Sequence, residues 1–196
     1  FRKISMNLNE INSFEEWEQL YKKLVFWELE LESSNDATMS EILDAQKMEA
    51  NQQFGRFIEK HYPDWFEDHQ APVMSHTLFK NKIAEELTNT QPTLLVVIDN
   101  LRYDQWKTLE PTVNTYYKTQ EDSLYYSILP TATQYARNAL FSGLMPSEME
   151  KLYPQYWKND NDEGGKNLFE AKFLEAQLKR LGLSHLKHEY IKITNL

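Results

Sequence analysis

A carboxylate and a hydroxyl group each follow a run of residues that is typical of a buried strand. Asp99 directly follows the aliphatic run 94–98, and Thr133 follows the run 124–129 after a turn at Pro130. In α/β proteins, ligands bind beyond the carboxyl ends of strands, where a carboxylate suits a metal ion. A hydroxyl group becomes a nucleophile when a metal removes its proton, and a helix start favours phosphate. The pair therefore predicts metal-assisted chemistry on a phosphate group.

Both residues also have an ordinary structural interpretation. Asp99 is placed to cap the helix predicted just after it, and Thr131 or Thr133 to cap the helix after Pro130. Side chains of these types are the usual N-caps, because their oxygens accept hydrogen bonds from free backbone amides. Taken singly, each residue favours the capping role. The two together favour a shared site, since adjacent parallel strands would bring them to one edge of the sheet.

Two arginines lie close to these residues in the sequence. Arg102 and Arg137 are candidates for binding the oxygens of a phosphoryl group, which a guanidinium can grip with two parallel hydrogen bonds. The alternative for each is a surface ion pair with Asp104 or Glu110. The sequence leaves the two possibilities equally open.

The second part of the chain predicts an α/β fold with a mostly parallel sheet. Short apolar or β-branched runs indicate three strands, at 94–98, 124–129 and 190–194. Helical patterns fill the gaps between these runs, which is the order expected of a parallel sheet. The helices are predicted at 101–109, 134–142, 147–153 and 168–181, with Asn167 as the N-cap of the last.

The first part of the chain predicts a small antiparallel bundle of helices. Apolar residues three or four apart indicate a helix at 13–33, and Ser13 and Glu16 form a capping box at its start. A second capping box at 38–41 opens another helix, and residues 75–87 form a third amphipathic stretch. We therefore place a helical bundle at 1–91 and the α/β domain at 92–196. The aromatic face of the first helix serves either the core or an interface; its members are Phe14, Trp17, Tyr21 and Trp27.

Composition excludes several classes of function. The formal charge of −9 disfavours a surface that coats nucleic acid, and the lack of cysteine excludes disulfides, Cys-ligated zinc and a thiol nucleophile. The longest aliphatic run, 94–98, is far too short to span a membrane. The chain starts at Phe1 rather than Met, so we expect it to be a segment of a longer protein.

Several sequence motifs resemble a known family. The sequence VVIDNLRYD at 96–104, PTAT at 130–133 and FSGLMP at 141–146 are similar to the opening of a PglZ domain, a branch of the alkaline phosphatase superfamily. The sequences FEEWEQL at 14–20 and LVFWE at 24–28 resemble the helical linker of PorX-like response regulators. The resemblance covers nearly the whole chain, although no receiver domain precedes the helices.

The resemblance implies a zinc-dependent phosphodiesterase or phosphatase. It puts Thr133, rather than Thr131, at the nucleophile and metal-binding position, and Asp99 at the first metal-ligand position. Two zinc ions are implied, together with a phosphoester, oligonucleotide or cyclic-nucleotide substrate. The family's other ligands, a set of Asp and His, lie beyond this chain, so we expect the segment alone to be inactive. The resemblance also implies a cytoplasmic, non-membrane regulator of type IX secretion that acts with a sensor kinase or a sigma factor.

A second hypothesis makes the chain a non-catalytic signalling module. Degenerate enzyme domains are often kept for binding, so the helical part would then dimerise or dock a transcription factor. A sheet that lacks its later strands also leaves an unpaired edge, which predicts a homodimer.

Overall fold

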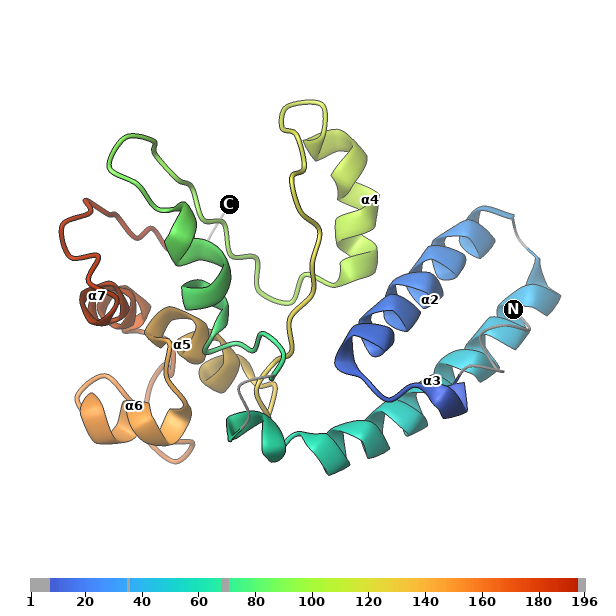
Figure 1. Cartoon of the computed structure of the whole chain (residues 1–196), viewed down its shortest axis with the longest axis horizontal. Helices are drawn as coiled ribbons and strands as arrows, with labels where there is room; N and C mark the ends of the chain where they lie inside the picture. Colours follow the sequence, from blue (N-terminus) through green and yellow to red (C-terminus); the bar gives the residue numbers. More distant parts are fainter. Residues whose placement is uncertain (1–7, 35, 68–70, 194–196) are drawn as a thin grey trace. The chain divides into compact units, whose positions relative to one another are not determined.

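The computed structural model describes residues 8–34, 36–67 and 71–193. The chain divides into two compact units (Figure 1). One unit comprises Phe1–Pro72 together with Asn100–Leu124, and the other comprises Val73–Asp99 together with Tyr125–Leu196. Each unit therefore contains two stretches of chain that are far apart in the sequence.

The first unit is built on two paired helices. Its helices α2 (Phe14–Ser34) and α3 (Ala37–His61) pack against each other, and α4 (Tyr103–Val113) contacts α2. The short 3₁₀ turns η1 (Leu8–Glu10) and η2 (Asp64–Phe66) flank the pair. Apolar side chains repeated every three or four residues form one buried cluster between these helices, since each helix presents a single apolar face. The cluster consists of Leu8, Trp17, Leu20, Leu24, Leu43, Ala50 and Phe57.

The aromatic face of α2 belongs mainly to this core. Trp17 is buried and meets the ring of Phe54 edge to face, with 5.3 Å between the ring centroids. Phe14 and Trp27 pack against the same cluster. Of the two alternatives that the sequence leaves open, core packing is therefore confirmed for these residues.

The starts of α2 and α3 are fixed by local hydrogen bonds. The capping box at α2 is confirmed, because the Glu16 amide donates to Ser13 Oγ (3.3 Å) and the Ser13 amide donates to Glu16 Oε2 (3.2 Å). The prediction for α3 is wrong by a residue or two. Its N-cap is Asp36, whose Oδ1 accepts from the Met39 amide (3.1 Å), and Thr38 lies inside the helix.

We expect the substitution Asp36→Ala to destabilise the helical pair by about 1 kcal/mol, because one amide at the start of α3 loses its acceptor. Thr38→Ala is the matched control. It removes a hydroxyl that caps nothing, so it should leave stability unchanged or raise it slightly. Thermal unfolding followed by circular dichroism measures both, and an equal loss in the two variants would contradict the assignment of the cap to Asp36.

The second unit is a cluster of short helices. Helices α5 (Thr133–Ser142) and α7 (Glu170–Arg180) pack together, and α6 (Pro146–Leu152) contacts α5. The predicted helical stretch at 75–87 is present over 78–86, but not as a regular α-helix. It holds the π-helical turn η3 (Phe79–Ile83) and the 3₁₀ turn η4 (Ala84–Glu86). Side chains from several of these elements are fully or almost fully buried: Met74, Phe79, Ile128, Ala139, Met149, Phe173 and Leu178.

The predicted α/β fold with a mostly parallel sheet is wrong. The described residues contain helices and no sheet, and their nearest approach to one is an isolated parallel bridge between Met74 and Tyr126. There the Tyr126 amide donates to the Val73 carbonyl (2.8 Å), and the Ser75 amide donates to the Tyr126 carbonyl (3.1 Å). The described part of the predicted strand 190–194 is also not a strand, and Thr194 lies outside the described residues.

The run 94–98 shows why the prediction fails. Its side chains are exposed rather than buried, from 83% for Leu94 to 38% for Val97. A β-branched run favours extended backbone, but a strand also needs a neighbour to accept and donate its hydrogen bonds. No neighbour pairs with this run among the described residues. The sheet edge on which the homodimer prediction rested is therefore not present there, and dimerisation itself stays a prediction.

Within the part of the chain that the structure describes, no helix is both long enough and apolar enough to cross a membrane.

Candidate functional site

Thr133 is the first residue of α5 and does not cap it. The N-cap is Ala132, and no side chain accepts a hydrogen bond there. The first amides bonded within the helix belong to Tyr135 and Ala136, which both donate to the Ala132 carbonyl. The capping alternative is therefore wrong for both Thr131 and Thr133. The half-buried Thr133 side chain stands at the positive end of the helix dipole, where an anion is favoured.

Asp99 is bound to Arg137 across the second unit. Arg137 Nη1 donates to Asp99 Oδ2 at 2.8 Å, and the Asp99 side chain is 41% exposed. Asp99 does not cap the following helix, because α4 begins at Tyr103 with Arg102 at the N-cap position. The structure thus brings together two of the four predicted site residues, as an ion pair.

A buried carboxylate holds Arg137 from the other side. Glu170, the first residue of α7, is only 1% exposed and accepts a hydrogen bond from Arg137 Nε. It also accepts from the Tyr190 hydroxyl (2.6 Å) and from Lys192 Nζ (3.1 Å). A carboxylate at this depth needs such donors, because an unpaired buried charge is very unfavourable. The guanidinium therefore lies between two carboxylates, Asp99 and Glu170.

The charges of this cluster control its ionisation. Burial raises the pKa of Glu170, but the hydrogen bonds from Arg137, Tyr190 and Lys192 outweigh it and hold the pKa below its usual range. Burial and the bond to Glu170 together raise the pKa of the Tyr190 hydroxyl. Glu170 is thus ionised and Tyr190 is neutral at neutral pH. With Asp99, Arg137 and Lys192 the cluster holds two negative and two positive charges.

Arg102 belongs to the first unit and forms the ion pair that the sequence offers as its alternative. Its Nε donates to Asp104 Oδ1 (3.0 Å) and its Nη2 to Asp104 Oδ2 (2.7 Å). The Arg102 side chain is largely exposed. The structure does not place it with the other predicted residues.

Two family comparisons match almost the whole chain. Residues 1–66 match the PorX response regulator linker domain, and residues 78–195 match the BREX system PglZ alkaline phosphatase-like domain. The second match covers more than half of the chain. The chain belongs to the PglZ family. Comparison with curated proteins found no match. A PorX-type linker followed by a PglZ domain fits a response-regulator-like protein with a phosphatase-like domain.

The PglZ-matched residues that the structure describes do not fit a zinc site. Zinc needs three or four ligands from Cys, His, Asp or Glu. Among the described residues, no group of three or more such side chains could hold a metal ion. Asp99, the predicted first ligand, is instead paired with Arg137. No step of a reaction can therefore be assigned to zinc from these residues.

Glu170, Tyr190 and Lys192, all within the PglZ match, were not among the site residues predicted from the sequence. Tyr190 and Lys192 stand two residues apart, and both side chains reach Glu170. That spacing was a usable signal. Glu170 had no such signal, because acidic residues are common in the first turn of exposed helices. Asn167, predicted to cap α7, instead donates from Nδ2 to the Thr133 carbonyl (3.3 Å), and the position before α7 is Phe169.

A polar loop of the PglZ domain is hydrogen-bonded to α5 near its start. The Tyr135 hydroxyl donates to Asp160 Oδ1 (2.8 Å), and the neighbouring Gln134 also binds Asp160. Farther along α5, Asn138 Nδ2 donates to the Lys166 carbonyl (3.0 Å). Residues 160–167 therefore lie along the end of α5 that carries Thr133.

Proposed function

We propose that the chain is part of a PorX-like response regulator whose PglZ domain cleaves a phosphoester, with Thr133 as the nucleophile. The observation that carries this proposal is the place of Thr133 at the uncapped start of α5. Its hydroxyl oxygen is not used by the helix, and the free amides beside it suit a phosphate oxygen. The PglZ match, which names an alkaline phosphatase-like domain, supports the same chemistry.

The proposed reaction is a displacement at phosphorus. The Thr133 oxygen forms a bond to phosphorus while the bond to the leaving alcohol breaks, and the hydroxyl proton passes through solvent to that alcohol. Water then hydrolyses the phosphothreonine, which releases the phosphate product and restores the Thr133 hydroxyl. A phosphodiester such as an oligonucleotide is the proposed substrate. Zinc is proposed as the cofactor of the whole domain, where it would lower the pKa of the hydroxyl. Because the described residues do not assemble a zinc site, we expect the 196-residue chain to be inactive alone.

Arg137 has a positioning role in this proposal. Its guanidinium binds Glu170 through Nε and Asp99 through Nη1, so among the described residues Nη2 keeps both of its donors for a phosphate oxygen. Arg102 is more exposed than Arg137, and solvent weakens its ion pair with Asp104.

The wider role proposed for the full-length protein is control of type IX secretion, in the cytoplasm, with a sensor kinase or a sigma factor as partner. The PorX linker match supports this setting. The rival function, a docking module without catalysis, predicts that signalling survives when the nucleophile is removed.

We expect Thr133→Ala to lower phosphodiester hydrolysis by the full-length protein at least about 1000-fold, as loss of a nucleophile does in other hydrolases. The assay is release of nitrophenol from bis-nitrophenyl phosphate with zinc present. Thr131→Ala is the matched control and should stay near wild-type activity. An equal loss in both variants, or none in Thr133→Ala, would contradict the assignment of the nucleophile. Zinc-dependent turnover by the 196-residue chain would contradict its predicted inactivity.

A further inference from the structure

One segment of the PglZ match packs with the linker instead of with the rest of that match. Residues 100–124 lie within the 78–195 match, yet they form one compact unit with the linker helices. The segment starts directly after Asp99 and contains α4, which lies against α2 (Figure 1). The first unit is therefore assembled from both family matches.

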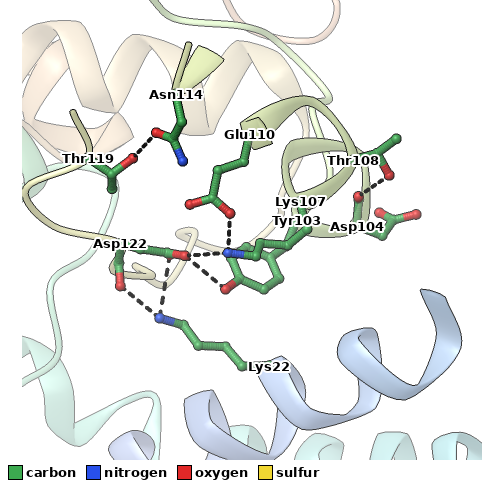
Figure 2. A network of polar contacts seen from close by, with 9 residues as sticks. All are labelled: Lys22, Tyr103, Asp104, Lys107, Thr108, Glu110, Asn114, Thr119 and Asp122. Carbon is green, nitrogen blue, oxygen red and sulfur yellow. Dashed lines mark hydrogen bonds and ion pairs between the residues drawn. The ribbon is translucent and has the colours of Figure 1, made fainter. Parts of the chain in front are cut away.

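The contact centres on Asp122, which binds side chains from both α2 and α4 (Figure 2). Lys22 of α2 donates from Nζ to the Asp122 carbonyl (2.8 Å) and approaches its Oδ1 (3.5 Å). From α4, the Tyr103 hydroxyl (3.0 Å) and Lys107 Nζ (3.3 Å) reach Asp122 Oδ2. Both oxygens of this carboxylate thus face donors from the same unit.

Ring contacts strengthen the same surface. The rings of Tyr21 and Tyr103 lie 6.0 Å apart between centroids. Lys22 Nζ and Lys107 Nζ each lie 5.7 Å from the centre of the Tyr103 ring, within the range of a cation–π contact. The Tyr103 side chain is therefore held by α2, by α4 and by Asp122 together.

The charged side chains around Asp122 form an internal contact and not a ligand site. Lys22 and Lys107 are matched by Asp122 and Glu110, which pairs with Lys107. The side chains of Lys22 and Asp122 are each 24% exposed, so their bonds are screened less than those of surface pairs. A balanced, half-buried network of this kind holds two elements in register without attracting an ion.

We infer that the Tyr21–Lys22 face of α2 is the docking surface for segment 100–124, and that this docking joins the linker to the PglZ domain. Residues 100–124 are thus the part of the PglZ match that binds to the linker. A change that loosens α2 would therefore release residues 100–124 first. Neither family match by itself contains both sides of this contact.

Hydrogen exchange on the 196-residue chain, read by mass spectrometry, tests this inference. We expect Lys22→Ala to speed amide exchange in residues 100–124 about threefold to tenfold, the effect of losing a partly shielded charged hydrogen bond. Lys23→Ala is the matched control, because Lys23 is its exposed neighbour on α2, and it should leave these amides unchanged. The milder Tyr103→Phe variant removes only the hydroxyl group and should give a smaller rise in the same residues.

A double-mutant cycle separates docking from general destabilisation. Asp122→Ala removes the carboxylate that Lys22 approaches but keeps the carbonyl that it binds, so Lys22→Ala should still speed exchange in residues 100–124 of that variant, by a smaller factor than in the wild type. Purely additive effects would overturn the inference, as would normal protection of these residues in Lys22→Ala. Faster exchange in α5 and α7 to the same degree would also overturn it, because it would mean global unfolding.

Discussion

Replacing Glu170 by alanine is expected to lower the free energy of unfolding of the second unit by about 3 kcal/mol, toward the lower end of the range for breaking a buried ion pair. The side chain is 1% exposed and accepts bonds from Arg137, Tyr190 and Lys192. Its loss leaves three donors without their acceptor. The effect stays at the lower end because Arg137 keeps Asp99 as a partner.

Hydrogen exchange of α5 and α7 in a urea series measures this loss for the second unit alone. Glu175→Ala on the same helix is the control. Among the described residues the ion-pair partner of Glu175 is exposed Lys172, one turn away, so its removal should leave the unit's stability unchanged within error. Equal stability of Glu170→Ala and wild type would show that the buried cluster is not a structural element of the domain.

The Glu170 cluster also predicts that the stability of the second unit depends on pH. The pKa of Glu170 in the folded unit lies below its usual range, so the unfolded chain binds the proton first as the pH falls. The stabilisation that ionised Glu170 gives the second unit is complete above the ordinary glutamate pKa of about 4.3. It is lost as the pH falls through the lower pKa that Glu170 has in the folded unit. Glu170→Gln cannot ionise, so this variant should lose that part of the pH dependence.

Gly143→Ala is expected to destabilise the second unit by about 3 kcal/mol, from backbone strain and a displaced buried amide. Gly143 ends α5 in the left-handed conformation, with φ of 64°. A Cβ atom there would stand 2.8 Å from Gln177 Cδ. Gln177 is 2% exposed and donates to the carbonyls of Leu140 (3.0 Å) and Phe141 (2.9 Å), so it cannot move without breaking these bonds.

Two other glycines separate the causes of that loss. Gly182 also has a positive φ, 75°, but nothing lies within 4 Å of its added Cβ, so Gly182→Ala should cost about 1–2 kcal/mol from strain alone. Gly55 lies within α3 with open space around it, so Gly55→Ala should stabilise the first unit by about 0.5–1 kcal/mol. The same urea series measures Gly143→Ala and Gly182→Ala, and exchange of the α2 and α3 amides in urea measures Gly55→Ala. A loss in Gly143→Ala no greater than in Gly182→Ala would show that Gln177 is not a packing constraint.

The candidate site could be predicted only in part. The positions of Asp99 and Thr133 in their motifs are sequence properties, and the PglZ match includes both. Their surroundings were not predictable, because Arg137 meets Asp99 and Glu170 only after three separate segments come together. Arg102 differs, because it pairs with Asp104 only two residues away, a local contact that the sequence offered as an alternative. A guanidinium can choose between several carboxylates, and only the folded chain brings one of them within reach.

The sequence by itself determined most of the helices and the family. Helix α2 begins where the Ser13–Glu16 box predicts, and α5, α6 and α7 lie close to their predicted ranges, because a helix makes its hydrogen bonds and caps within a few residues. Only the tertiary structure decided the rest. It left 94–98 unpaired, placed 100–124 against α2 and buried Glu170 beneath Arg137. Strands, docking surfaces and buried ion pairs all need a partner from a distant part of the chain, which local patterns cannot specify.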